Sequence, residues 1–199
     1  MNTGDDPRAV IRRLYRGVDG FEIPRADVRA VARSKGSSTY GELMPTATLR
    51  LLAQLEIGRE DVFVDLGAGV GKVVMLAALS TPAARVRGVE LSAKRVGLAR
   101  GVQTQAEHEG LIGLGQVEFV AGDMLRVPLD DATVVYTCST AFSDVFMRKL
   151  HRRLAKLPAL RKLVSLQDFA DHPGFELVEV YKLDASWKRR TKIYVYEPA

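Results

Sequence analysis

The feature that most constrains the fold is a glycine-rich turn between an apolar strand and a helix. Residues Val64–Lys72 read Val-Asp-Leu-Gly-Ala-Gly-Val-Gly-Lys, after the short apolar run Val62–Val64 and before a helical pattern over Val73–Leu79. Three glycines at alternate positions allow a tight turn and let a ligand approach the backbone closely. A strand, a tight turn and a helix in this order predict the first unit of a parallel α/β sheet.

The rest of the chain continues this alternation. Further strands are expected over residues 86–89, 117–120, 133–137 and 163–166, and further helices over 92–109 and 144–157. Residues 175–182 and 192–196 read as two strands with no helix between them, which predicts an antiparallel pair at the sheet edge. We therefore predict an α/β protein with a Rossmann-like, seven-strand, mostly parallel sheet that ends in an antiparallel pair.

The first part of the chain has a different pattern. Residues 7–17 and 24–34 read as short amphipathic helices, and residues 44–54 form a third helical pattern. Pro7 and Pro24 suit first-turn positions of helices. We predict an N-terminal helical extension over residues 1–38 and a core domain over residues 39–199.

The composition is that of an ordinary globular protein. The chain has 199 residues, of which 47% are hydrophobic and 27% charged. Met1–Arg13 lacks the apolar stretch of a secretory signal, no run is long and apolar enough to cross a membrane, and Cys138 is the single cysteine. We therefore expect a protein of the reducing cytoplasm, without membrane contact.

The net charge is +5, and basic residues gather in the N-terminal arm, in residues 148–161 and in residues 188–190. Basic surfaces raise the encounter rate with anionic partners, including nucleic acid. Solvated helix faces have the same composition, and few aromatic residues are interleaved here. Both interpretations stay open, and no pattern indicates an oligomeric state.

Three kinds of ligand site can contain a glycine turn of this type. A P-loop has a longer glycine spacing and a hydroxyl residue after the lysine, but Val73 follows Lys72. A dinucleotide site has its last glycine one residue later, and the charge of Asp65 is unfavourable beside a pyrophosphate. The same charge suits a cofactor with a free ammonium group and no phosphate, which favours S-adenosylmethionine.

Two further acids follow predicted strands. Glu90 ends the second strand about twenty residues after the turn, where an acid can accept hydrogen bonds from ribose hydroxyls. Asp123 follows the third strand, where it could accept from an adenine amino group while Met124 packs on the ring. Together with Asp65 they lie at the carboxyl edge of a parallel sheet, where open α/β sheets bind ligands.

At this point the sequence resembles the non-SET protein-lysine methyltransferases of the disruptor-of-telomeric-silencing type and their prokaryotic relatives, which have the class I seven-strand fold. The resemblance runs from Thr39 to about Tyr196. Its matching stretches are Thr39–Glu42, Phe63–Val74, Gly88–Glu90, Gly122–Asp123, Ala141–Phe142 and Ser186–Trp187. It implies a methyltransferase domain over residues 39–199 that transfers a methyl group from S-adenosylmethionine to a lysine side chain of a protein.

The resemblance also implies residue roles. The cofactor is expected to contact Tyr40, Glu42, Asp65, Gly67, Gly69, Gly71, Lys72, Glu90, Asp123 and Met124. Methyl transfer is expected beside Cys138, with Phe142, Trp187 and Tyr194 lining a narrow lysine channel. Two positions depart from the family pattern, because Cys138 stands where the first residue of an Asn pair is typical and Lys72 where Gln is common.

Methyl transfer from a sulfonium is an in-line displacement that demands positioning and desolvation rather than a general base. No residue pattern activates Cys138 as a nucleophile, and a small buried hydrophobe is its commoner role. His108, His151 and His172 show no metal-ligand spacing, so we predict surface histidines and no metal site.

Three other functions stay open. A nucleic-acid methyltransferase is compatible with the net positive charge of the chain, although the Asn/Asp-Pro-Pro-aromatic motif of base amine methylation is absent after strand four. A small-molecule methyltransferase could use the N-terminal helices as a lid. A non-catalytic cofactor-binding module is compatible with the Asn-to-Cys departure at Cys138.

Overall fold

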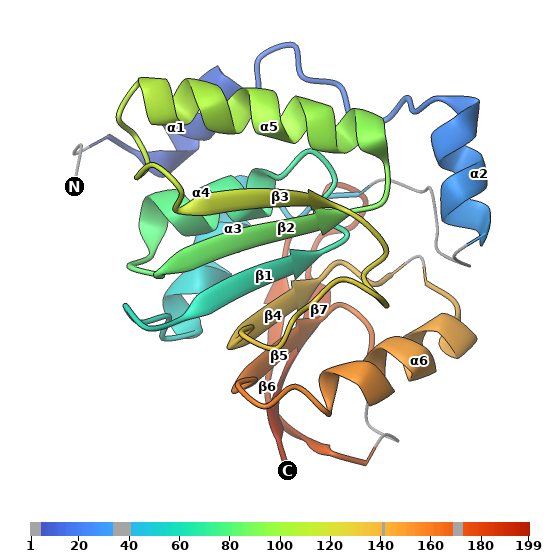
Figure 1. Cartoon of the computed structure of the whole chain (residues 1–199). Helices are drawn as coiled ribbons and strands as arrows, with labels where there is room; N and C mark the ends of the chain where they lie inside the picture. The colour runs from blue at the N-terminus through green and yellow to red at the C-terminus, as the bar shows by residue number, and fades with distance from the viewer. Residues whose placement is uncertain (1–4, 34–40, 141, 169–172) are drawn as a thin grey trace.

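A single seven-stranded sheet organises the molecule (Figure 1), in the strand order β3-β2-β1-β4-β5-β7-β6. The computed structural model describes residues 5–33, 41–140, 142–168 and 173–199. The strands are β1 Val62–Leu66, β2 Arg85–Glu90, β3 Val117–Ala121, β4 Val134–Thr137, β5 Lys162–Ser165, β6 Phe175–Leu183 and β7 Thr191–Pro198. The helices assigned in these residues are α1 Pro7–Leu14, α2 Arg25–Arg33, α3 Pro45–Gln54, α4 Lys72–Ser80, α5 Ala93–His108 and α6 Asp144–Leu154.

The pairing of the strands confirms the predicted fold class. Strands β1 to β5 pair in parallel, whereas β7 pairs antiparallel with both β5 and β6. The helices that link successive parallel strands are long enough for crossover connections, and the short link between β6 and β7 allows a hairpin. The order reverses at β1, with β2 on one side and β4 on the other, which is where ligands bind in open α/β sheets.

Alternate residues of the central strands face two separate cores. Phe63, Val86 and Val134 point to the core that also contains side chains of α1, α3, α4 and α5. Val64, Leu66 and their equivalents on the neighbouring strands point to the core under α6. The sheet is therefore covered on both faces, as expected for parallel strands, and Figure 1 shows α6 on its own side of the sheet.

The glycine turn adopts the backbone conformation that its composition predicts. Gly67, Gly69 and Gly71 all have positive φ angles, of 88°, 57° and 85°. A Cβ atom on Gly71 would lie 2.4 Å from the ring of Phe119. This glycine is therefore required both by its backbone conformation and by the packing of α4 against β3.

One prediction about a histidine is wrong. His151 lies in α6 with 2% of its surface exposed, and its ring meets the edge of Phe175 with ring centroids 4.7 Å apart. It belongs to the apolar face of the helix with Met147, Leu150 and Leu154, at the spacing of adjacent helical turns. His108 is exposed as predicted, and His172 lies outside the described residues.

The N-terminal segment packs on the sheet domain. Val10, Ile11, Leu14 and Tyr15 of α1 and the residues after it are buried in the core that contains α4. The division of the chain between residues 38 and 39 stays a prediction. Among the described residues, no helix combines the length and apolar character that crossing a bilayer requires.

Candidate cofactor and substrate site

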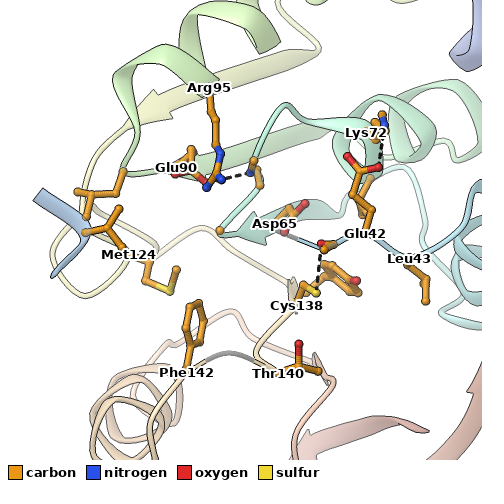
Figure 2. A pocket seen from close by; sticks show the side chains of 18 of the residues that line it. Glu42, Leu43, Asp65, Lys72, Glu90, Arg95, Met124, Cys138, Thr140 and Phe142 are labelled. Carbon is orange, nitrogen blue, oxygen red and sulfur yellow. Dashed lines mark hydrogen bonds and ion pairs between the residues drawn. The ribbon is translucent and has the colours of Figure 1, made fainter. Parts of the chain in front are cut away.

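A cavity of about 450 Å³ opens at the carboxyl edge of the sheet, where the strand order reverses (Figure 2). Its wall combines the glycine turn, the ends of β2 and β4, the segment around Glu42, and side chains from α6 and the β6–β7 connection. Of the predicted residues, those that line it are Glu42, Asp65, Gly67, Gly69, Lys72, Glu90, Asp123, Met124, Cys138, Phe142 and Trp187.

Two predicted residues lie elsewhere, and a third is not described. Gly71 does not line the cavity and instead packs against Phe119. Tyr194 lines a neighbouring cavity, which shares Thr140 and Trp187 with the first. Tyr40 lies outside the described residues.

Asp65 forms the polar floor of the cavity. Its side chain is 2% exposed, and its Oδ1 atom accepts no hydrogen bond from any described residue. Burial, and then the negative charge of Glu90, raise the pKa of the Asp65 carboxyl well above its ordinary value. A buried acceptor without a donor is costly, so this position is suited to a ligand that brings a donor or a positive charge.

Glu90 fixes the shape of the glycine turn. Its Oε2 atom accepts a hydrogen bond from the backbone N–H of Gly69 at 2.9 Å, and its Oε1 atom accepts one from Ser92 N–H at 2.8 Å. Ser92 in turn caps α5 through the N–H of Arg95. Each carboxylate oxygen can accept a further hydrogen bond, so Glu90 can bind hydroxyl groups while holding the turn.

An ion pair closes one side of the cavity. Lys72 Nζ lies 2.6 Å from Glu42 Oε2 and 5.6 Å from the ring centroid of Tyr15. The Tyr15 hydroxyl donates to the carbonyl oxygen of Val70 at 3.0 Å, so the residue after α1 also supports the glycine turn. Sequence reasoning missed Tyr15, because only tertiary packing brings it to the turn.

The other end of the cavity is apolar. Met124 and Phe142 converge on Gly67, and a Cβ atom built there would lie 3.5 Å from Met124 Cε and 3.8 Å from Phe142 Cζ. Phe142 also packs on Phe146 of α6, with ring centroids 4.8 Å apart. Asp123 accepts a hydrogen bond from the N–H of Leu125 at 2.9 Å, which orders the loop after β3. This end of the cavity suits a flat apolar group whose polar edge atoms reach Asp123.

Cys138 connects the floor of the cavity to the segment above it. Its thiol donates to the carbonyl oxygen of Gly41 across 3.7 Å, and the ring of Trp187 packs so closely on Gly41 that a Cβ atom there would lie 2.5 Å from it. Burial and the charge of Asp65 raise the pKa of the Cys138 thiol to about 12. The thiol is therefore protonated near neutral pH and positions the chain rather than acting as a nucleophile.

Sequence reasoning also missed Tyr136, Arg95 and Thr140, which line the cavity. Tyr136 sits within a buried strand and reads as a core residue, although its hydroxyl finds no hydrogen-bond partner among the described residues. Its spacing of two residues from Cys138 was the available signal, because alternate residues of a strand share a face. In the described part of the chain, no three His, Cys, Asp or Glu side chains cluster as metal ligands do.

Comparison with known proteins agrees with this geometry. Residues 23–190 match the family described as "Histone methylation protein DOT1". The H3 lysine-79 specific histone-lysine N-methyltransferase of Caenorhabditis elegans is 32% identical over 142 residues, which cover 66% of this chain and 15% of that protein. The enzyme of the same description from Mycosarcoma maydis is 30% identical over 181 residues, which cover 86% of this chain and 22% of that protein.

Solved structures share the fold. An RNA methyltransferase from Salinibacter ruber, crystallised with S-adenosyl-L-homocysteine, superposes with a TM-score of 0.59 at 24% identity, covering 77% of this chain and 92% of that one. The present chain spans less than a quarter of the length of the two histone methyltransferases above. The family match covers most of the chain, from α2 to the link between β6 and β7, and includes the glycine turn, Glu90 and Trp187. The chain therefore belongs to the DOT1 family of histone methylation proteins.

Proposed function

We propose that this protein is an S-adenosylmethionine-dependent methyltransferase that transfers a methyl group to the amine of a protein lysine side chain. Membership of the DOT1 family supports the reaction, and the arrangement of acids and apolar residues around the cavity supports the cofactor. The short span of the chain relative to the histone methyltransferases leaves the identity of the protein substrate open.

The observation that carries the proposal is the buried Oδ1 atom of Asp65, to which no described residue donates a hydrogen bond. S-adenosylmethionine has an α-ammonium group, which supplies both the donor and the positive charge that this buried carboxylate lacks. A pyrophosphate in the same place would meet the negative charges of Asp65 and Glu90. The residues present therefore fit S-adenosylmethionine better than a dinucleotide.

The remaining residues fit the rest of the same molecule. We assign the ribose hydroxyls to Glu90, the adenine to Met124 and Phe142 with Asp123 at the rim, and the methionine end to Asp65, Glu42 and Lys72. Gly67 and Gly69 leave room for the ligand next to the backbone. Glu90 and the Glu42–Lys72 pair are already held by hydrogen bonds, so these residues need little ordering when the cofactor binds.

When bound, S-adenosylmethionine supplies a methyl group on a sulfonium that is already a good leaving group. The protein must then exclude water and hold the acceptor amine in line. Trp187 and the neutral thiol of Cys138, which both contact Gly41, form a weakly polar wall at this point. Weakly polar surroundings disfavour the ammonium form of a lysine, so the chain can obtain a neutral amine without a general base.

We include a reducing, cytoplasmic location in the proposal. The half-buried thiol of the single cysteine lies in the proposed site, where oxidation would change its contact with Gly41.

Isothermal titration tests the cofactor. We expect S-adenosylmethionine and S-adenosylhomocysteine to bind the wild type, and NADH to give no heat. Asp65→Asn removes one charge-assisted hydrogen bond at nearly constant volume, so affinity should fall about ten-fold to a hundred-fold. Asp130→Asn, an exposed acid outside the cavity, is the matched control and should bind like the wild type.

Transfer of a radiolabelled methyl group tests the reaction. Lysine-containing proteins should accept label, and the same proteins with acetylated lysines should not. Absence of cofactor binding would contradict the whole proposal. Binding with label appearing only in RNA or in a small amine would keep the cofactor and replace the acceptor.

A further inference from the structure

The second cavity, of about 540 Å³, lies beside the first at the carboxyl edge of the sheet. Its wall is formed by residues just beyond β5, by the end of β6, and by the turn and first residues of β7. Thr140 and Trp187 line both cavities, so the second cavity continues from the mouth of the first. We call this second cavity the basic groove.

Most of the charged side chains that line the basic groove are positive. Lys182, Lys188, Arg190 and Lys192 line it; all four are exposed, and none forms an ion pair with a described residue. Asp168 is the acid among the lining residues, and it accepts a hydrogen bond from the hydroxyl of Tyr196 at 2.8 Å. With four cations and one carboxylate among its lining residues, the basic groove has a surplus of positive charge.

Two of these lysines lie directly opposite each other on adjacent strands, where their like charges repel. Lys182 of β6 and Lys192 of β7 are register partners in the antiparallel pair, so their side chains project side by side from the same face. Like charges directly opposite each other destabilise a strand pair. An anion bound between the two ammonium groups would offset the repulsion.

We propose that the basic groove binds acidic residues that flank the acceptor lysine of the protein substrate, an inference that rests on the proposed function. A lysine that approaches Trp187 past four cations is repelled unless its own neighbours carry negative charge. Aspartate or glutamate next to the acceptor lysine would pair with Lys182 and Lys192 and hold the peptide at the mouth of the first cavity. The same cations disfavour the ammonium form of the acceptor and so assist its deprotonation.

Fluorescence anisotropy with two labelled peptides tests this inference. Both peptides contain one central lysine; in the first it is flanked by two acids on each side, and in the second by the matching amides. Both are titrated with the 199-residue protein saturated with S-adenosylhomocysteine. The wild type should bind the acidic peptide about ten-fold more tightly than the amide peptide at low salt, and less so at high salt.

Two double variants distinguish the effect of the charges in the basic groove from the effect of positive charge elsewhere on the surface. K182Q/K192Q should lose the preference for the acidic peptide while its Tm stays equal or rises, since a repulsive pair has been removed. R148Q/K149Q removes the same charge from exposed positions of α6 and should keep the preference. A 12-nucleotide single-stranded RNA, titrated in the same way, is the competing ligand.

The outcomes are distinct. Equal binding of the two peptides by the wild type, or equal loss in both double variants, would overturn the proposal. Tighter binding of RNA than of the acidic peptide, lost in K182Q/K192Q, would overturn it in favour of a nucleic-acid groove. Titration of S-adenosylhomocysteine alone reports on the proposed function separately, because Lys182 and Lys192 do not line the first cavity.

Discussion

Asp65 of β1 and Tyr136 of β4 are register partners in the parallel sheet, and each carries a buried oxygen with no hydrogen-bond partner in the described part of the chain. Register partners on adjacent strands point to the same face, and both side chains line the cavity. Leaving such atoms unpaired costs about 1–3 kcal/mol each. Two such oxygens in one cavity, both unpaired among the described residues, indicate that the protein loses some stability in order to bind a ligand there.

The first prediction concerns the pH dependence of stability. Burial raises the pKa of Asp65 in the folded protein, so the folded state holds this proton at pH values where the unfolded chain has lost it. The contribution of Asp65 to stability is therefore fully present below its ordinary pKa, near 4, and is lost as pH rises towards the raised folded value. Without ligand, the free energy of unfolding should fall from pH 5 to pH 8.

Denaturant unfolding at several pH values measures this slope. Asp65→Asn has no proton to lose at this position, so the slope that Asp65 contributes should be absent and the variant should equal or exceed the wild type in stability at pH 8. Saturating S-adenosylhomocysteine, whose ammonium favours the ionised carboxylate, should reduce the slope in the wild type. Parallel slopes in wild type and variant would contradict the assignment.

The second prediction concerns the hydroxyl of Tyr136. Tyr136→Phe removes an unpaired buried oxygen without changing the ring, so the unliganded protein should become more stable by about 1 kcal/mol. Because Tyr136 and Asp65 are register partners that both line the cavity, the variant should bind S-adenosylhomocysteine more weakly. Binding of 5′-methylthioadenosine, which lacks the amino-acid end, should not change.

Thermal unfolding and two titrations measure these effects. Tyr181→Phe is the control, since its hydroxyl is outside both cavities. Equal loss of affinity for both ligands would place the Tyr136 hydroxyl at the nucleoside end instead.

Much of the fold was predictable from the sequence, because each strand–helix unit carries its own periodicity and turn signal. The strand that contains Val62, the glycine turn and the helix after it were all placed within a few residues, and so was the antiparallel pair at the end. Asp65 and Glu90 were found for the same reason. A carboxylate at the end of a predicted parallel strand must lie at the ligand-binding edge, whichever strand it follows.

The residues that were missed depend on which elements meet in space. Tyr136 reads as an ordinary core residue until β4 is paired with β1, and Tyr15 has no relation to the glycine turn until α1 packs on α4. The spacing of the histidines reports on metal binding and not on burial, whereas the position of His151 on the apolar face of α6 indicates burial. The basic groove requires the register of β6 and β7, which the sequence pattern did not specify.

The third prediction compares two glycines. Gly71→Ala forces a side chain onto a φ of 85° and into the ring of Phe119, so it should destabilise the protein by about 3 kcal/mol. Gly97→Ala lies on the exposed face of α5 with open space around it, and should stabilise the protein by about 0.5–1 kcal/mol. Urea unfolding of both variants measures the difference. Equal effects would mean that the packing of Phe119 against the turn is not required.

The fourth prediction concerns the reactivity of Cys138. Its thiol pKa of about 12 leaves roughly one molecule in ten thousand ionised at pH 8, whereas an unperturbed cysteine is partly ionised there. Alkylation by iodoacetamide should therefore be about a thousand-fold slower in the folded protein than in urea. Mass spectrometry of timed samples follows the modification directly, since the chain has one cysteine. A folded protein that reacts as fast as the unfolded chain would show an ionised thiol in the cavity and would make Cys138 a candidate nucleophile after all.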